Sequence, residues 1–231
     1  MSDRLDVSTL ITGYAEGCFP MAAGRDGEVA WYRPTRRAVL PVDDRFHVPR
    51  RLGKVLRSGR YRITFDTAFA EVVSCCSAPR RNAARGDHGE TWISREIERA
   101  YAELHAAGFA VSVEAWADAA AFDAGRVGEG PSGPIEPVRR GNAVLAGGLY
   151  AVTLGRAVFA ESMFSRGRDA SGVCLVALVE RCRAAGVTLL DIQMDSTHLR
   201  RFGAEPIGQR AFMARLEKAL GIDEAEGAED E

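Results

Sequence analysis

The chain has 231 residues, 46% of them apolar, and a formal charge of −2, which predicts a soluble globular protein with a substantial hydrophobic core. No apolar run approaches the ~20 residues of a transmembrane helix, and the N-terminus lacks the features of a secretory signal. Five cysteines without C-x-x-C spacing and four scattered histidines argue against a disulfide framework and a zinc site. We therefore expect a cytoplasmic protein without a bound metal.

The first 43 residues form the first predicted unit. Turn residues and aromatics follow one another closely in GCFPMAAGRDGEVAWYRPTRRAVLP, which indicates a small, partly irregular N-terminal α/β subdomain. From residue 44 to residue 222 helical and strand periods alternate, as in an α/β or α+β domain.

Residues 45–65 are strongly basic and contain no acid. Their seven cationic side chains are Arg45, Arg50, Arg51, Lys54, Arg57, Arg60 and Arg62. A solvated helix face and a surface for a polyanion explain such a run equally well.

Regular elements follow up to residue 117. The strand-like residues 61–65 lead to a helix that Asp66 caps, and a polar loop is expected over residues 77–92. Ser94 then caps a second helix, and residues 109–116 alternate like a strand.

The remaining segments are less uniform. Residues 118–143 have no clear period, so we expect an inserted surface loop. A hairpin is predicted at Leu154–Gly155, followed by a helix capped by Ser171, a buried strand over residues 187–194 and a last helix over residues 209–220.

The last nine residues, 223–231, hold six acids and no base. This composition predicts a disordered acidic tail. It leaves 30 basic and 26 acidic residues over residues 1–222, a formal charge of +4.

Three polar side chains interrupt apolar strands. By strand alternation Phe159, Glu161 and Met163 share one face, and Asp191 and Gln193 share a face of another strand. Burying a lone carboxylate costs several kcal/mol unless it is paired or used. A core arginine or a backbone cap would explain one such residue, whereas three in two strands indicate a functional site.

Seven segments carry a resemblance to a known family. They are YAEGCFPMA, WYRPTRRAVLP, FHVPRRLGKVLRSGRYRITFDTAFAEVVSCC, ETWISREIERAYAELHAAGFAVSVEAW, LAGGLYAV, AESMFSRGRDAS and LLDIQMDSTHLRRFGAEPI. In this order they resemble the leucyl/phenylalanyl-tRNA–protein transferases over most of residues 10–220. The resemblance implies a bacterial enzyme that moves leucine or phenylalanine, and methionine less well, from tRNA to proteins that begin with Arg or Lys. This transfer marks those proteins for degradation.

The resemblance also implies a fold and a set of site residues. The fold is α+β, with a small N-terminal subdomain and a second domain similar to the GNAT acetyltransferases, and we expect a monomer. Glu161, Asp191 and Gln193 match active-site residues. The implied aminoacyl pocket consists of Leu149, Met163, Leu175, Leu178, Cys182 and Leu190.

The tRNA contacts are implied in the same way. Trp92 and Met21 match positions near the 3′ adenosine, where Met21 replaces a family aromatic, and Trp31 and Tyr32 are further candidates for stacking. The phosphates of the acceptor stem would contact Arg50, Arg51, Lys54, Arg57, Arg60 and Arg62. The insertion at residues 118–143 departs from the family pattern.

The implied reaction needs little besides positioning. An aminoacyl ester is already activated, so we expect no cofactor, and neither ATP nor a metal is needed. The enzyme has to hold the acceptor amine against the ester carbonyl. We expect the amide oxygen of Gln193 to accept a hydrogen bond from the amine, and Asp191 to orient Gln193 or bind the amine. Glu161 supplies negative charge for the α-ammonium group or for the cationic acceptor side chain.

Two other functions fit parts of the pattern. An acyl-CoA-dependent N-acetyltransferase has the same fold, but RGRDASG lacks a convincing glycine spacing for a pyrophosphate loop. A non-catalytic RNA-binding module explains the basic stretch and leaves the three polar groups without a purpose.

Overall fold

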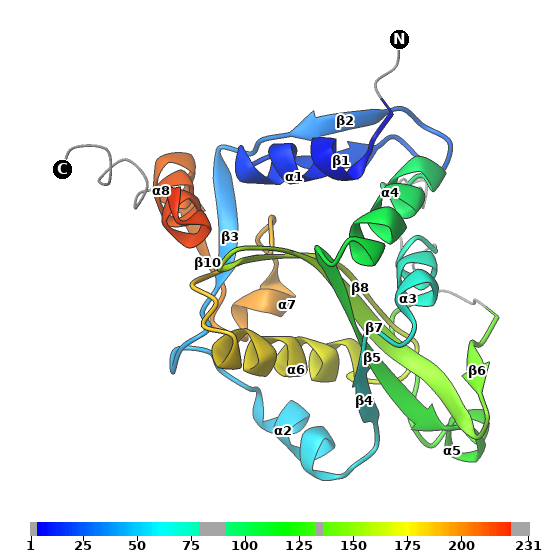
Figure 1. Cartoon of the computed structure of the whole chain (residues 1–231). Helices are drawn as coiled ribbons and strands as arrows, with labels where there is room; N and C mark the ends of the chain where they lie inside the picture. The colour runs from blue at the N-terminus through cyan, green and yellow to red at the C-terminus, as the bar shows by residue number, and fades with distance from the viewer. Residues whose placement is uncertain (1–3, 79–90, 133–135, 223–231) are drawn as a thin grey trace, which may run out of the picture.

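The computed structural model describes residues 4–78, 91–132 and 136–222. An eight-stranded sheet carries helices on both faces, and a two-stranded sheet lies beside it (Figure 1). The strands are β1 (Phe19–Ala22), β2 (Val29–Tyr32), β3 (Arg36–Leu40), β4 (Arg62–Phe65), β5 (Ala110–Asp118), β6 (Arg139–Arg140), β7 (Ala143–Leu154), β8 (Ala157–Ser165), β9 (Leu189–Asp191) and β10 (Glu205–Gly208). The helices are α1 (Val7–Ala15), α2 (Arg50–Arg57), α3 (Phe69–Cys76), α4 (Arg95–Ala106), α5 (Ala119–Asp123), α6 (Ala170–Ala184), α7 (Thr197–Arg200) and α8 (Gln209–Leu220).

The large sheet is mixed. Its order is β10-β3-β9-β8-β7-β5-β4, and β6 pairs with β7. β8 and β9 run parallel and are connected through α6, whereas the other neighbours are antiparallel. The α+β class, the mixed sheet flanked by helices and the small N-terminal part are confirmed. The GNAT-like form of the second domain stays a prediction.

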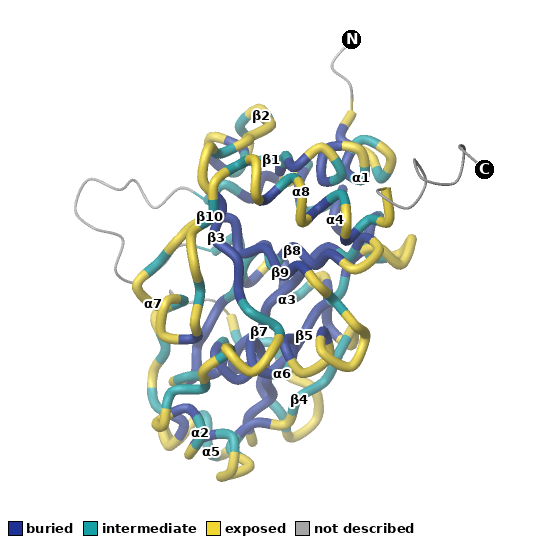
Figure 2. Tube along the Cα trace, turned by 90° about the vertical axis from the view of Figure 1, so that its left-hand side faces the viewer, coloured by how far each residue is buried: buried dark blue, intermediate teal, exposed yellow. Residues whose placement is uncertain are grey.

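Two apolar clusters fill the space between the sheet and its helices. On one face α1, α3 and α4 bury residues such as Leu10, Val72 and Ile97, and on the other face α2 and α6 bury Leu52 and Leu175. Figure 2 shows the buried residues following the central strands. Among the described residues no helix is long and apolar enough to cross a membrane.

Several elements lie where the sequence places them. β7 and β8 form the hairpin expected at Leu154–Gly155, and Gly155 takes the positive φ of 54° that the turn requires. Ser94 caps α4, because its side chain accepts a hydrogen bond from the Ile97 N–H at 3.2 Å. The last helix, α8, covers the predicted residues 209–220.

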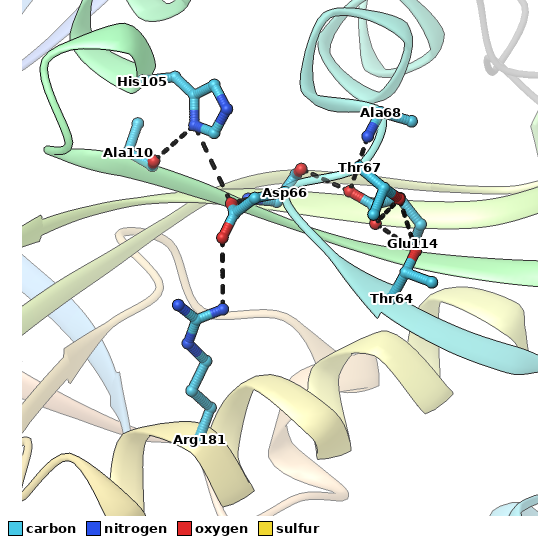
Figure 3. A network of polar contacts seen from close by, with 9 residues as sticks. Thr64, Asp66, Thr67, Ala68, His105, Ala110, Glu114 and Arg181 are labelled. Atoms are coloured by element: carbon cyan, nitrogen blue, oxygen red, sulfur yellow. Dashed lines mark hydrogen bonds and ion pairs between the residues drawn. The ribbon is translucent and has the colours of Figure 1, made fainter.

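Asp66 does not cap α3, in contrast to the prediction. Its backbone is left-handed, with φ 57°, and its carboxylate accepts the Ser112 N–H at 2.8 Å and pairs with Arg181 at 3.4 Å (Figure 3). α3 begins only after Ala68, two residues later. A carboxylate that is held by a neighbouring strand and helix is not free to bind the helix N-terminus.

Glu114 on β5 takes over part of the helix-capping role that was expected of Asp66. This fully buried carboxylate faces the Ala68 N–H at 3.4 Å and accepts the hydroxyls of Thr64, Thr67 and Ser112 at 2.5–2.8 Å (Figure 3). Its oxygens are thereby paired without a cation. Glu114 therefore fixes the start of α3 on the sheet.

The start of α6 also differs from the prediction. The helix begins at Ala170, and its N-cap is Asp169 with φ 66°. Ser171 lies within the first turn, and its N–H donates to the Ser165 hydroxyl at 3.1 Å. The end of β8 thus ties down the helix that follows it.

The described part of residues 118–143 forms more structure than the expected surface loop. It contains α5 and β6, and residues 127–132, which we call the strap, run along the end of β8. The Ser132 N–H donates to the Ser165 carbonyl at 3.1 Å. At Gly130 a Cβ atom would lie 2.1 Å from the same carbonyl oxygen, so the strap requires glycine there.

The proposed domain limits stay predictions. β3 lies within the first 43 residues and yet pairs with β9 and β10 in the large sheet. The N-terminal unit therefore shares a strand with the rest of the chain. The acidic tail and most of the polar loop expected over residues 77–92 lie outside the described residues.

The contact between β7 and α6 gives a first prediction. A Cβ added at Gly147 would lie 2.6 Å from the Ala170 Cβ and 3.0 Å from its backbone, so Gly147→Ala should lower the free energy of unfolding by about 1–3 kcal/mol. Gly53→Ala, in α2, meets only the end of the Arg57 side chain at 3.3 Å and should raise it by up to about 1 kcal/mol. Urea denaturation measures both, and equal effects of the two substitutions would contradict the packing described.

Candidate functional site

The candidate site lies where two parallel strands separate. β8 and β9 pair as far as Phe159 and Asp191, after which β9 ends while β8 continues to Ser165. Glu161 on β8 and Gln193 after β9 face each other across this gap. The carboxyl ends of parallel strands are a common position for ligand sites in open sheets.

A β-bulge places Glu161 in the gap. β7 pairs with the residues on both sides of Glu161 but skips Glu161 itself. The extra residue reverses the alternation, so Phe159 belongs to one core cluster and Met163 packs against the other. The prediction that Phe159, Glu161 and Met163 share a face is therefore wrong for Met163.

Glu161 is enclosed by hydrogen-bond donors. It is 8% exposed and accepts Gln193 Nε2 at 2.8 Å and the Tyr101 hydroxyl at 3.2 Å. Burial raises the pKa of Glu161 to about 8, the hydrogen bond from Tyr14 opposes the rise, and the charge of Asp191 adds to it. A carboxyl group with this pKa exchanges its proton close to neutral pH.

Asp191 is held by an arginine that the sequence did not single out. Arg37 of β3 is 1% exposed and donates to both carboxylate oxygens of Asp191, through Nε at 3.3 Å and through Nη2. Arg37 also donates to the Gly17 carbonyl at 3.0 Å, and its guanidinium carbon lies 4.8 and 4.5 Å from the ring centres of Phe19 and Phe212. Burial raises the pKa of Asp191, and Arg37 opposes the rise.

A sequence signal for Arg37 exists. Arg37 begins the buried run 37–40 of β3, where the three following residues are apolar. A buried acid such as Asp191 needs a cation, and an arginine inside an apolar strand is a natural candidate. A core arginine was considered as a partner for Glu161, whereas the structure places it on Asp191.

The backbone of Gln193 is strained and firmly held. Gln193 has a left-handed φ of 52°, and its N–H donates to Asp191 Oδ1 at 2.8 Å. Its carbonyl accepts the Ala38 N–H at 3.1 Å, so β3 holds the residue from the other side. With Nε2 committed to Glu161, the side-chain carbonyl oxygen is left as the acceptor.

A cavity of about 500 Å³ opens at this gap. Among the six predicted pocket residues, Leu149, Met163 and Leu175 line it. The other three lie in the core behind it and are 1–3% exposed, namely Leu178, Cys182 and Leu190. The strap adds Pro131 and Ser132 to the lining, which the sequence did not indicate.

The candidate stacking residues lie in different places, and one of the four lines the cavity. Trp92 lines the cavity, and its carbonyl accepts the Ala22 N–H at 3.0 Å. Met21 pairs with Ala30 in the small sheet, packs against the core and does not line the cavity. Trp31 and Tyr32 are 39% and 47% exposed on β2. The structure thus brings only Trp92 to the cavity.

The basic residues form a surface beside α6. α2 turns Leu52 and Val55 inward, so its cationic side chains point outward. Arg51 pairs with Asp169 at the start of α6 at 3.3 Å, and Ser171 in the first turn of α6 lines the cavity. Arg60 and Arg62 follow α2, and Arg62 is exposed on β4.

Comparison with known proteins decides the family. The model of the leucyl/phenylalanyl-tRNA protein transferases matches residues 39–128 and 135–217, and the model of their N-terminal domain matches residues 3–35. The chain belongs to this family. The resemblance stated from the sequence motifs is confirmed.

Relatives of this transferase family match over nearly their whole length. The leucyl/phenylalanyl-tRNA–protein transferase of Rubrobacter xylanophilus is 46% identical over 222 residues, which is 96% of this chain and 98% of the relative. Those of Herpetosiphon aurantiacus and Akkermansia muciniphila are 43% and 41% identical, over 95% of this chain and 97% and 98% of the relatives. The roles of individual residues stay predictions.

The Arg37–Asp191 pair gives a second prediction. Arg37→Met leaves a buried carboxylate without its cation and should lower the free energy of unfolding by about 3–5 kcal/mol. Arg36→Met, at the exposed neighbouring position, should change it by less than about 0.5 kcal/mol. Urea denaturation compares the two, and equal values would show that the pair is unimportant for stability.

The pKa of Glu161 gives a third prediction. Because the folded-state pKa of about 8 lies above the ordinary value of 4.5, the folded protein binds the extra proton between these pH values. Stability should fall as the pH rises from 5 to 8, by up to about 1.4 kcal/mol per pH unit from this group. Glu161→Gln should show a flatter pH profile in urea denaturation, and parallel profiles would contradict the assignment.

Proposed function

We propose that this protein transfers leucine or phenylalanine from aminoacyl-tRNA to the N-terminus of proteins. The finer form of the proposal is that the acceptors begin with Arg or Lys and that methionine is a poorer donor. The observation that carries it is the Glu161–Gln193 pair beside an apolar cavity wall, in a chain that belongs to this family. The comparisons favour neither an acyl-CoA-dependent N-acetyltransferase nor a non-catalytic RNA-binding module.

The donor side chain fits the apolar wall. The wall consists of the apolar side chains of Leu149, Met163 and Leu175, which require no hydrogen-bond partner from the donor. Such a wall suits an aliphatic or aromatic side chain. An apolar pocket separates near-isosteric side chains by only about 1–3 kcal/mol. The selectivity between leucine, phenylalanine and methionine is therefore graded.

Glu161 deprotonates the acceptor amine, and Gln193 orients it. An α-amino group has a pKa of about 7.7–8.0, which matches the pKa of about 8 of Glu161. Transfer of a proton from the α-ammonium group to the ionised Glu161 is therefore close to thermoneutral. The side-chain carbonyl oxygen of Gln193 accepts a hydrogen bond from the neutral amine. This hydrogen bond orients the lone pair of the amine nitrogen toward the ester carbonyl.

The chemical step then follows without further activation. The amine nitrogen forms a bond to the ester carbonyl carbon, and the bond from this carbon to the ribose oxygen breaks. The second amine proton passes to the departing ribose oxygen, directly or through the neighbouring ribose hydroxyl. The role proposed for Asp191 is to fix Gln193 by accepting a hydrogen bond from the Gln193 N–H. Arg37 in turn holds Asp191 through their ion pair.

The tRNA is held by charge. The exposed cations of α2 lie beside α6, whose first turn lines the cavity, so a phosphate backbone on α2 would extend toward the reacting end. Such contacts carry no base specificity, which suits an enzyme that accepts several tRNAs. Trp92 lines the cavity, and the role proposed for it is to stack on the terminal nucleoside.

The fourth prediction tests this function. Labelled leucine should pass from leucyl-tRNA to a peptide that begins with Arg, and not to one that begins with Ala, without ATP or acetyl-CoA. Gln193→Ala should lower the rate by about 100-fold or more, the scale of a positioned proton-transfer or orienting group, with unchanged affinity for leucyl-tRNA.

Gln209→Ala is the matched control, because Gln209 begins α8 and does not line the cavity. This variant should retain its activity. If wild-type protein binds leucyl-tRNA and yet transfers to neither peptide, the proposed function is rejected, and acetyl-CoA becomes the next donor to assay.

A further inference from the structure

The acceptor proposed above carries a second positive charge, on its first side chain. The buried acids identified from the sequence are poorly suited to bind it. Asp191 is fully buried and committed to Arg37, and Glu161 is enclosed by Tyr101 and Gln193. The proposed function also assigns Glu161 to the α-ammonium group of the acceptor, so it is not available to the side-chain cation. The cation needs another anion.

Asp195 is the other carboxylate among the described residues that line the cavity. Its side chain is 26% exposed and already binds a guanidinium group, that of Arg200. Arg200 Nε lies 2.9 and 3.0 Å from the two carboxylate oxygens, and Nη2 donates to one of them. The cavity edge thus contains a site whose shape and charge fit the guanidinium group of an arginine.

The Asp195–Arg200 pair is not required to build α7. Ser196 caps this helix by accepting the Leu199 N–H at 3.2 Å. Arg200 is the last residue of the helix, and its side chain is 62% exposed. An exposed ion pair of this kind stabilises a protein only slightly, so Arg200 can leave Asp195 readily.

The spacing along the chain also fits an acceptor residue. Gln193 and Asp195 are separated by one residue and both line the cavity, so one acceptor residue can contact both at the same time. Met194 lies between them, lines the cavity and is 63% exposed. Its apolar side chain can cover the methylene stem that joins the two charged ends of the acceptor residue.

We propose that Asp195 binds the cationic side chain of the acceptor's first residue and that Arg200 occupies this subsite until the acceptor displaces it. The inference rests on the proposed function and names how the same site recognises its acceptor. Asp195 acts in binding, while the amine is positioned by Gln193.

The test uses opposite effects of the two partners. Transfer from saturating leucyl-tRNA is measured to peptides that begin with Arg or with citrulline, its uncharged isostere. Asp195→Asn should raise the KM for the Arg peptide about tenfold, equivalent to about 1.4 kcal/mol, and reduce the preference for Arg over citrulline. Arg200→Met removes the competing guanidinium group and should lower the KM for the Arg peptide two- to threefold, with kcat little changed.

Asp43→Asn is the matched control, because Asp43 forms an exposed pair with Arg45 at 2.8 Å and does not line the cavity. Its KM should equal that of the wild type. If Asp195→Asn and Arg200→Met both raise KM, the pair is structural and the inference fails. An unchanged preference for Arg over citrulline in Asp195→Asn would overturn it as well. A wild type that transfers to no peptide would reject the proposed function itself.

Discussion

The buried ion pair between Arg37 and Asp191 is the constraint on which the site depends. It lies at the point where β9 ends, next to the pairing of Val39 with Asp191. Asp191 also accepts the Gln193 N–H, and β3 accepts and donates hydrogen bonds on either side of this turn. Two charges removed from water cost several kcal/mol each, and their attraction offsets this cost only when the geometry is good. The benefit is a fixed backbone at Gln193, in a conformation that a glutamine rarely adopts.

Glu161 imposes a second constraint, which joins distant parts of the chain. Its hydrogen-bond partner Tyr101 comes from α4, and Tyr14, which contacts Tyr101, comes from α1 in the N-terminal part. The N-terminal residues are therefore involved in the electrostatics of the site and are not an independent attachment. Donors from three directions stabilise the ionised form, while burial disfavours it more strongly, and the balance leaves the pKa of Glu161 near that of an amine.

The sequence predicts the frame of this protein better than its site geometry. Local signals locate the hairpin at Leu154–Gly155 and the cap at Ser94, because turn and capping preferences act within a few residues. The convergence of Glu161 and Gln193 follows from polar residues in apolar strands. The bulge at Glu161 and the partner of Asp191 depend on which strands become neighbours, and no local pattern records that. The strap at residues 127–132 was likewise hidden, since the N–H groups of Gly130 and Ser132 hold it to residues 165 and 166, and backbone groups leave no residue-specific signal.

In the proposed function, the two sides of the cavity select their substrates by different physical interactions. On the proposed donor side, the cavity is lined by Leu149, Met163 and Leu175, which would select mainly by size, and the residues behind them are already packed. Differences between apolar side chains would therefore remain within a few kcal/mol. On the proposed acceptor side, a cationic side chain would have to replace the guanidinium group of Arg200, and an uncharged residue would leave Asp195 paired with Arg200. A polar site rejects a substrate that lacks the matching group much more strongly than an apolar site rejects a missing methylene. Broad acceptance of donors and strict choice of acceptors are therefore compatible within one small cavity.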